Sequence, residues 1–293
     1  MLLNLFALTN DPAKRIVRFK LTEEVQRELS ALIIEQSDTF DNFIEQSIEF
    51  DGKYKPDHGE ALYIENYDDI DNLEATIRNP LGVEEVAPCN NFFTSIKALF
   101  TGYETDGNSI RVLIQYFDKR KIISTNGLSI FHSGDVYKKI EGIGISIDTK
   151  LSATYQNGIL KFFSFHLLRQ IFDLSEYYKE ATDVDITNFA EMEMVKAENP
   201  TQLVAMADSW IRRKISLVQQ SEILNNVPLN QMKAVALEFS IPFETIITEG
   251  VEMIKLPSEK AELKKLLRFL DEDYYRSPLS NTNFVTNSKR EVE

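Results

Sequence analysis

The sequence is short of the residues that define several protein classes. Its single cysteine, Cys89, cannot form an intramolecular disulfide, so nothing indicates an oxidising compartment. Gly 11 and Pro 9 in 293 residues exclude a collagen-like or low-complexity chain. No apolar run approaches the ~20 residues of a membrane-spanning helix, and the opening MLLNLFALTN lacks the basic region of a signal peptide. We therefore expect a cytosolic globular protein.

Positive charge is also scarce. Asp+Glu 46 outnumber Lys+Arg 32, which gives a formal net charge of −14 at pH 7. This sign disfavours indiscriminate binding to nucleic acid, although it leaves room for a local basic patch. Hydrophobic residues make up 43% of the chain, so one large or two modest domains could each bury a core.

Motifs for catalysis and cofactor binding are missing too. The three histidines, His58, His132 and His166, are far apart and lack the spacing of zinc ligands. There is no Walker A sequence and no Gly-x-Ser-x-Gly elbow, and the pair Gly142 and Gly144 lacks the third glycine of a dinucleotide fingerprint. We expect no metal site, no cofactor, no catalytic nucleophile and no small-molecule substrate.

The first and middle parts of the chain show strand patterns. Residues 15–21 (RIVRFKL) alternate basic and apolar side chains, and Thr22 then has the features of a helix N-cap. Asn157-Gly158 is a strong signal for a two-residue hairpin turn. Further along, short runs rich in β-branched and aromatic residues predict an antiparallel meander over 110–117, 120–124, 142–148, 151–156 and 158–163.

The rest of the chain is mainly helical. The pattern predicts helices over 164–172, from Ser175, from Asn199 through Leu217, over 230–239, and after Ser258, with a hairpin at 243–256. Strands and helices are therefore segregated, which is typical of the α+β class. We place an α/β part with an antiparallel meander at 1–172 and a mainly helical part with a small hairpin at 173–293.

One acidic constellation could support catalysis. Asp118 ends one predicted strand, and Asp148-Thr149-Lys150 follows another. Two carboxylates that hold Mg²⁺, with a lysine that orients the attacking water, form half of the core of one large nuclease class. A polar turn between two strands explains the same residues, and short acid-x-Lys matches arise often in a chain that is 27% charged. A nuclease that uses Asp118, Asp148 and Lys150 is therefore an alternative hypothesis.

Basic residues form several local clusters. Lys260, Lys264 and Arg268 follow i, i+4, i+8 spacing, which aligns three cations on one flank of a helix whose leucines mark the buried side. We expect Lys264 and Arg268 to be largely exposed. A solvated helix face explains the same spacing. The clusters at Lys119–Lys121 and at Lys138 and Lys139 are further candidates for an anionic partner.

Three segments together resemble a known family. They are DEDYYRSPLSNTNFVTNSKR (271–290), GIGISIDTKLSATYQNGILKFFS (142–164) and SFHLLRQIFDLSEYY (164–178), and the likeness spans about the last two thirds of the chain. They resemble the KwaB proteins of the Kiwa antiphage defence system. The resemblance implies a non-enzymatic, homodimeric subunit that binds DNA and blocks phage DNA replication and late transcription. It also implies a membrane-embedded partner, KwaA, that recruits the cytoplasmic protein to the inner membrane.

The basic residues in and beside segment 271–290 are our candidates for DNA contact. They are Lys260, Lys264, Arg268, Arg276, Lys289 and Arg290, and we expect Lys289 and Arg290 to be exposed like the helix flank. Arginine and lysine contacts to phosphates would orient the protein without reading DNA sequence. Besides the nuclease, a second alternative is an acidic protein-interaction module, such as a DNA mimic that occupies a DNA-binding enzyme.

Overall fold

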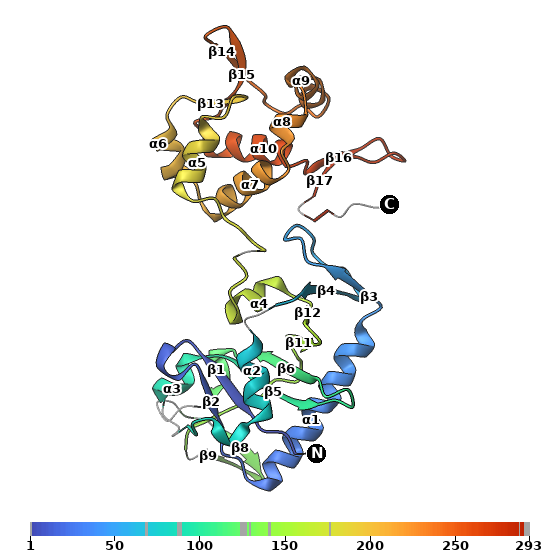
Figure 1. Cartoon of the computed structure of the whole chain (residues 1–293), viewed down its shortest axis with the longest axis vertical. Helices are drawn as coiled ribbons and strands as arrows, with labels where there is room; N and C mark the ends of the chain where they lie inside the picture. The colour runs from blue at the N-terminus through green and yellow to red at the C-terminus, as the bar shows by residue number, and fades with distance from the viewer. Residues whose placement is uncertain are drawn as a thin grey trace. The chain divides into compact units, whose positions relative to one another are not determined.

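A computed structural model describes residues 2–67, 70–86, 90–123, 128, 130–139, 142–175, 177–286 and 288–289. The chain divides into two compact units, each with its own hydrophobic core (Figure 1). The first unit comprises Met1–Phe50 and Pro56–Asp173, and the second comprises Asp51–Lys55 and Leu174–Glu293. The predicted α+β class is confirmed, because a large and mostly antiparallel sheet in the first unit precedes a part rich in helices.

The first unit is built on an eight-stranded sheet. Neighbouring strands are antiparallel except β3 and β4, which run parallel. Strands β5 and β6 are buried along most of their length, which explains their nearly continuous apolar sequences. The strand order is β2 (Ile16–Arg18), β1 (Phe6–Thr9), β5 (Ile96–Glu104), β6 (Ile110–Tyr116), β11 (Ala153–Gln156), β12 (Ile159–Phe162), β4 (Glu60–Glu65) and β3 (Gln46–Glu49).

Helix α1 (Glu23–Phe43) is the longest helix of this unit. The side chain of Thr22 accepts a hydrogen bond from the Val25 N–H at 3.4 Å, so the predicted N-cap is confirmed. Leu29, Ile33 and Phe40 form part of the buried core. The shorter helices are α2 (Asp71–Arg78), α3 (Asn90–Ser95) and α4 (Phe165–Ile171).

The predicted turn at Asn157-Gly158 is also confirmed. It joins β11 to β12 in antiparallel register, with Gln156 paired to Ile159. Asn157 has φ 53° and Gly158 has φ 80°. Two successive positive φ values define the turn that best matches the twist of a two-residue hairpin, and Asn-Gly is the pair that adopts it most readily.

The predicted continuous meander is wrong in one respect. Strand β6 pairs directly with β11, whereas β7 (Ile122–Ile123) and β10 (Gly144–Ile145) pair with each other in a separate two-stranded sheet. Ile122 and Ile145 pack against the core from there, so these apolar segments are partly buried without joining the main sheet. A second small hairpin, β8 (Ile130–Ser133) and β9 (Val136–Lys139), lies between them in sequence.

The second unit is mostly helical. A small sheet has the order β13 (Val195–Ala197), β15 (Val251–Leu256), β14 (Thr245–Thr248), and β14–β15 is the predicted hairpin. A second hairpin pairs β16 (Tyr274–Arg276) with β17 (Asn283–Val285). The helices are α5 (Asp183–Ala190), α6 (Pro200–Met206), α7 (Ser209–Gln220), α8 (Ile223–Asn226), α9 (Leu229–Glu238) and α10 (Lys260–Leu270). In the part of the chain that the structure describes, no helix is long and apolar enough to cross a bilayer.

Two predicted helix starts are wrong, and one predicted helix is divided in two. The helix expected from Ser175 begins at Asp183, because Thr182 and Asp185 form a capping box there. The helix expected from Asn199 through Leu217 is two helices, α6 and α7, because Asp208 caps the second one. The last helix begins at Lys260 after Glu259 rather than at a Ser258 cap, and no side chain caps it.

Candidate nucleic-acid interface

The main candidate surface is the basic flank of α10, which we call the α10 flank and define as Lys260, Lys264 and Arg268. Leu263, Leu266, Leu267 and Leu270 are buried and fix which side of the helix faces the core. The three cations therefore project beside this leucine stripe. Lys260 and Lys264 share one carboxylate, and Lys264 and Arg268 share one indole ring. The alignment predicted from the i, i+4, i+8 spacing is confirmed.

Asp208 is the carboxylate that two of these lysines share. Its Oδ2 lies 3.0 Å from Lys260 Nζ and 2.8 Å from Lys264 Nζ, and its Oδ1 accepts the Ile211 N–H at 2.9 Å to cap α7. Burial alone would raise the pKa of Asp208, but the bonds from Lys264, the Ile211 N–H and Lys260 outweigh it. The pKa of this carboxyl therefore lies well below its usual range.

Trp210 forms the other shared contact of the flank. Lys264 Nζ lies 5.3 Å and the Arg268 guanidinium carbon 5.5 Å from the centre of its ring, within reach for cation–π attraction. Arg268 forms no ion pair within the described ranges, and its Nε is buried without a hydrogen-bond partner. The three cations of the flank and the carboxylate of Asp208 together carry an excess of two positive charges.

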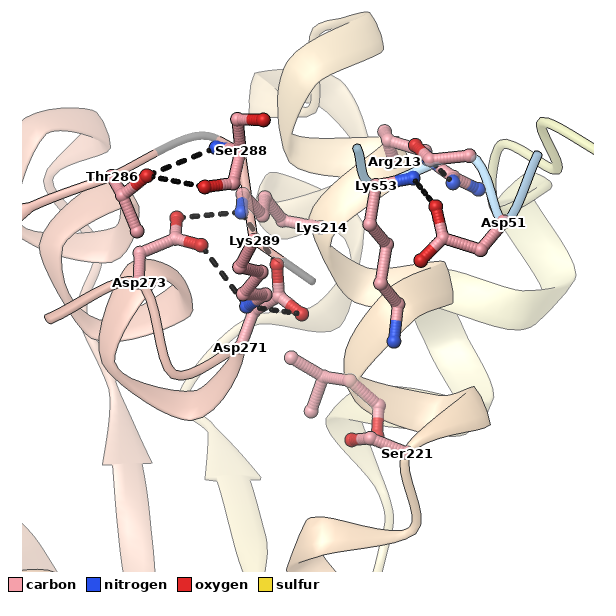
Figure 2. A network of polar contacts seen from close by, with 12 residues as sticks. Asp51, Lys53, Arg213, Lys214, Ser221, Asp271, Asp273, Thr286, Ser288 and Lys289 are labelled. Atoms are coloured by element: carbon pink, nitrogen blue, oxygen red, sulfur yellow. Dashed lines mark hydrogen bonds and ion pairs between the residues drawn. The ribbon is translucent and has the colours of Figure 1, made fainter. Parts of the chain in front are cut away.

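Lys289 belongs to a different cluster, which Figure 2 shows. Its Nζ lies 3.2 Å from Asp273 and 3.4 Å from Asp271, both of which are buried. The same two carboxylates each accept a bond of 2.5 Å from the buried Lys214. The hydroxyl of Ser288 accepts a hydrogen bond from the backbone N–H of Lys55, with 2.8 Å between the two heavy atoms. Lys289 therefore neutralises buried acids instead of extending the α10 flank.

Arg276 is also separate from the flank. It pairs with Glu238, packs over the ring of Phe239 and donates from Nε to Asn283 at 2.9 Å. Arg290 lies outside the described residues.

The prediction of largely exposed side chains is wrong for Lys264, Arg268 and Lys289, which are half-buried because each has an aromatic or acidic neighbour. Lys260 is exposed.

The two carboxylates of the alternative nuclease site each contact a nearby cation. Hydrogen bonds from the Arg120 side chain and N–H lower the pKa of Asp118 to about 2. Asp148 accepts the Thr149 N–H at 2.7 Å and lies 3.7 Å from Lys121 Nζ. Within the ranges that the structure describes, no three His, Cys, Asp or Glu side chains form a group suited to a metal ion. Lys150 lines a groove in the first unit.

The remaining basic clusters lie in the first unit. Lys119, Arg120 and Lys121 form a single 3-10 turn (Lys119–Lys121), and the side chains of Lys138 and Lys139 in β9 are exposed. Sequence patterns missed the two residues that complete the α10 flank. The run Asp208-Ser209-Trp210-Ile211 carries an N-cap signal for Asp208, but nothing local indicates that Asp208 and Trp210 meet α10.

Comparison with known proteins adds a family. No curated protein and no solved structure gives a significant match. The family model described as Kiwa protein KwaB-like matches residues 106–280, which is more than half of the chain. The match includes the α10 flank and the segments 142–164 and 164–178, but only the first half of segment 271–290. The chain therefore belongs to the KwaB family of the Kiwa antiphage defence system.

Proposed function

We propose that this protein acts in Kiwa defence by binding DNA without cutting it. Family membership supplies the defence context, and the finer function is our inference. The observation that supports DNA binding best is the excess of two positive charges on the α10 flank, on a chain whose net charge is −14. Binding of this kind would interfere with phage DNA replication and late transcription.

The chemistry of the flank suits phosphate contacts. Lys260 and Lys264 compete for one carboxylate, so either ammonium can turn to a phosphate while the other keeps Asp208 neutralised. Arg268 already packs on Trp210, which restricts its guanidinium and lowers the entropy cost of a bidentate phosphate bond. Such contacts carry no base readout, so binding should be weakly sequence-specific. Screening over ~8–10 Å limits repulsion from the distant acidic surface.

A salt titration tests this proposal. Binding of a fluorescent DNA duplex is measured by anisotropy at several salt concentrations for the full chain and for the triple variant Lys260→Gln, Lys264→Gln, Arg268→Gln. Log K should fall with log salt by about 0.9 per phosphate contact, and the triple variant should bind at least about tenfold more weakly with a shallower slope.

A matched control removes three positive charges elsewhere in the same unit. The control variant carries Lys179→Gln, Lys196→Gln and Lys265→Gln, of which Lys265 lies on α10 outside the flank. It should keep the wild-type slope. Equal losses in both triple variants would point to net charge alone, and unchanged binding in the flank variant would exclude the flank.

We further propose that the protein is not a nuclease. Asp118 and Asp148 each have a cationic neighbour, Arg120 and Lys121. Pure protein with plasmid and Mg²⁺ or Mn²⁺ should therefore leave the DNA intact. Cleavage that disappears in Asp148→Ala would support the alternative that uses Asp118, Asp148 and Lys150. An acidic interaction module would instead show no salt-sensitive affinity for DNA.

The assembly is part of the same proposal. We expect a homodimer, which would present two α10 flanks to one duplex, and light scattering at micromolar concentration should give twice the monomer mass. We also expect recruitment to the inner membrane through KwaA, since the family works in the Kiwa system. The protein should pellet with membranes when KwaA is co-expressed and remain in the supernatant without it.

A further inference from the structure

The first unit carries a groove beside the C-terminal half of α1. Its volume is about 330 Å³, which lies at the lower end of the range for ligand pockets. Helix α1 contributes four residues at i, i+3, i+4 and i+7, so they lie on one face of the helix. The groove is lined by Gln36, Thr39, Phe40, Phe43, Thr149, Lys150, Leu151 and Phe163.

Aromatic rings form one side of the groove. Phe163 lies 4.5 Å from Phe40 and 5.2 Å from Phe43 between ring centres, the second pair at 89°. Phe40 and Leu151 are buried, whereas Phe43 remains 42% exposed. A phenylalanine this exposed, next to other apolar side chains, leaves surface that an apolar ligand could cover.

The groove has few polar side chains, and two of them already form hydrogen bonds within the protein. The side-chain amide of Gln36 donates to the Asp148 carbonyl at 2.9 Å, and the Thr39 hydroxyl donates to the Glu35 carbonyl at 2.8 Å. Both are therefore already used within the protein. Thr149 and Lys150, which are exposed, remain to face a ligand.

Lys150 is the one charged side chain among the described lining residues. The neighbouring carboxylate, Asp148, accepts the Thr149 N–H and lies 3.7 Å from Lys121 Nζ. Lys150 forms no ion pair within the described part of the chain. An aromatic wall could also attract a cation, but a cation would meet the positive charge of Lys150 and no lining carboxylate.

We propose that this groove binds an amphipathic anion, namely an apolar chain or ring that carries one carboxylate or sulfonate. The apolar part covers Phe43, Phe163 and Leu151, and the anionic head pairs with Lys150. This site belongs to the first unit and shares no residue with the α10 flank of the second unit, and the proposal does not depend on DNA binding.

Decanoate and decanol provide a matched pair of probes, because they share a chain and differ in charge. The Phe43→Trp variant places a reporter in the groove, and Trp210→Phe in the same chain removes the other indole signal. Decanoate should change the fluorescence in a saturable manner and bind about two- to fivefold more tightly than decanol, the range expected for an exposed ion pair.

Lys150→Gln in this background should abolish the preference for decanoate while decanol binds as before. Lys150→Arg should keep it, and Lys119→Gln, which removes an exposed lysine outside the groove, should change neither affinity. Circular dichroism confirms that each variant is folded. Absence of saturable decanoate binding, or a preference that persists in Lys150→Gln, overturns the proposal.

Discussion

Loss of Lys214 should destabilise the second unit strongly. Its ammonium bonds to Asp271 and Asp273 at 2.5 Å each, and all three residues are buried, with exposed fractions of 8%, 4% and 1%. In Lys214→Met, two buried carboxylates keep only Lys289, at 3.2 and 3.4 Å, as a cationic partner. Removal of one member of a buried ion pair costs about 3–5 kcal/mol, and since Lys289 remains we expect the lower end of that range.

The single tryptophan allows the stability of the second unit to be measured separately from that of the first. Trp210 belongs to α7 in the second unit, so its fluorescence during urea unfolding reports that unit alone. With a slope of about 1–3 kcal/mol per molar urea, a loss of about 3 kcal/mol lowers the midpoint by roughly 1–3 M. Midpoints are compared rather than amplitudes, because Lys214 lies 5.7 Å from the Trp210 ring and its loss changes the signal itself.

Lys260→Met is the control, because Lys260 is exposed and Asp208 keeps Lys264 as a partner. Its cost should stay below about 1 kcal/mol. Asp271→Asn added to Lys214→Met should recover part of the loss, since it leaves one buried carboxylate, Asp273, for Lys289 to neutralise. If the urea midpoint of Lys214→Met shifts no further than that of Lys260→Met, the ion pairs of Lys214 with Asp271 and Asp273 do not stabilise the second unit.

Three further variants test single contacts. Asp208→Asn should tighten DNA binding in the salt titration, because it frees both lysines of the flank. Folding lowers the pKa of Asp208, so its stabilising contribution is fully present above the ordinary carboxyl pKa and is lost as pH falls through the lowered pKa. The difference in urea midpoint between wild type and Asp208→Asn should therefore begin to narrow below about pH 4. Gly158→Val should cost about 1–2 kcal/mol in thermal unfolding, since a β-branched residue resists φ 80°. Thr182→Ala should cost about 1 kcal/mol by Trp210 fluorescence, through loss of the capping box.

Local sequence patterns predicted the individual turns, caps and helices better than they predicted which strands pair with each other. The Asn157-Gly158 turn and the Thr22 cap depend on neighbouring residues only, and both are confirmed. The pairing of β7 with β10 depends on where Ile122 and Ile145 meet the core, which no local pattern records. The break between α6 and α7 carried a local signal at Asp208, but the apolar spacing through Leu217 continues across it and favoured one helix.

The candidate site also depends on contacts between residues that are distant in sequence, which local patterns do not record. Lys264 and Lys289 each have a basic neighbour in sequence, Lys265 and Arg290, and the sequence assigns the two lysines the same role. In the structure, Lys264 and Lys260 share one carboxylate, whereas Lys289 and Lys214 share two. Together with Arg268, the cluster around Asp208 keeps an excess of positive charge. The cluster around Asp271 and Asp273 is neutral, because two lysines face two carboxylates. The ability to attract a phosphate is therefore a property of the whole cluster, and Asp208, which lies far from α10 in sequence, sets it for this flank.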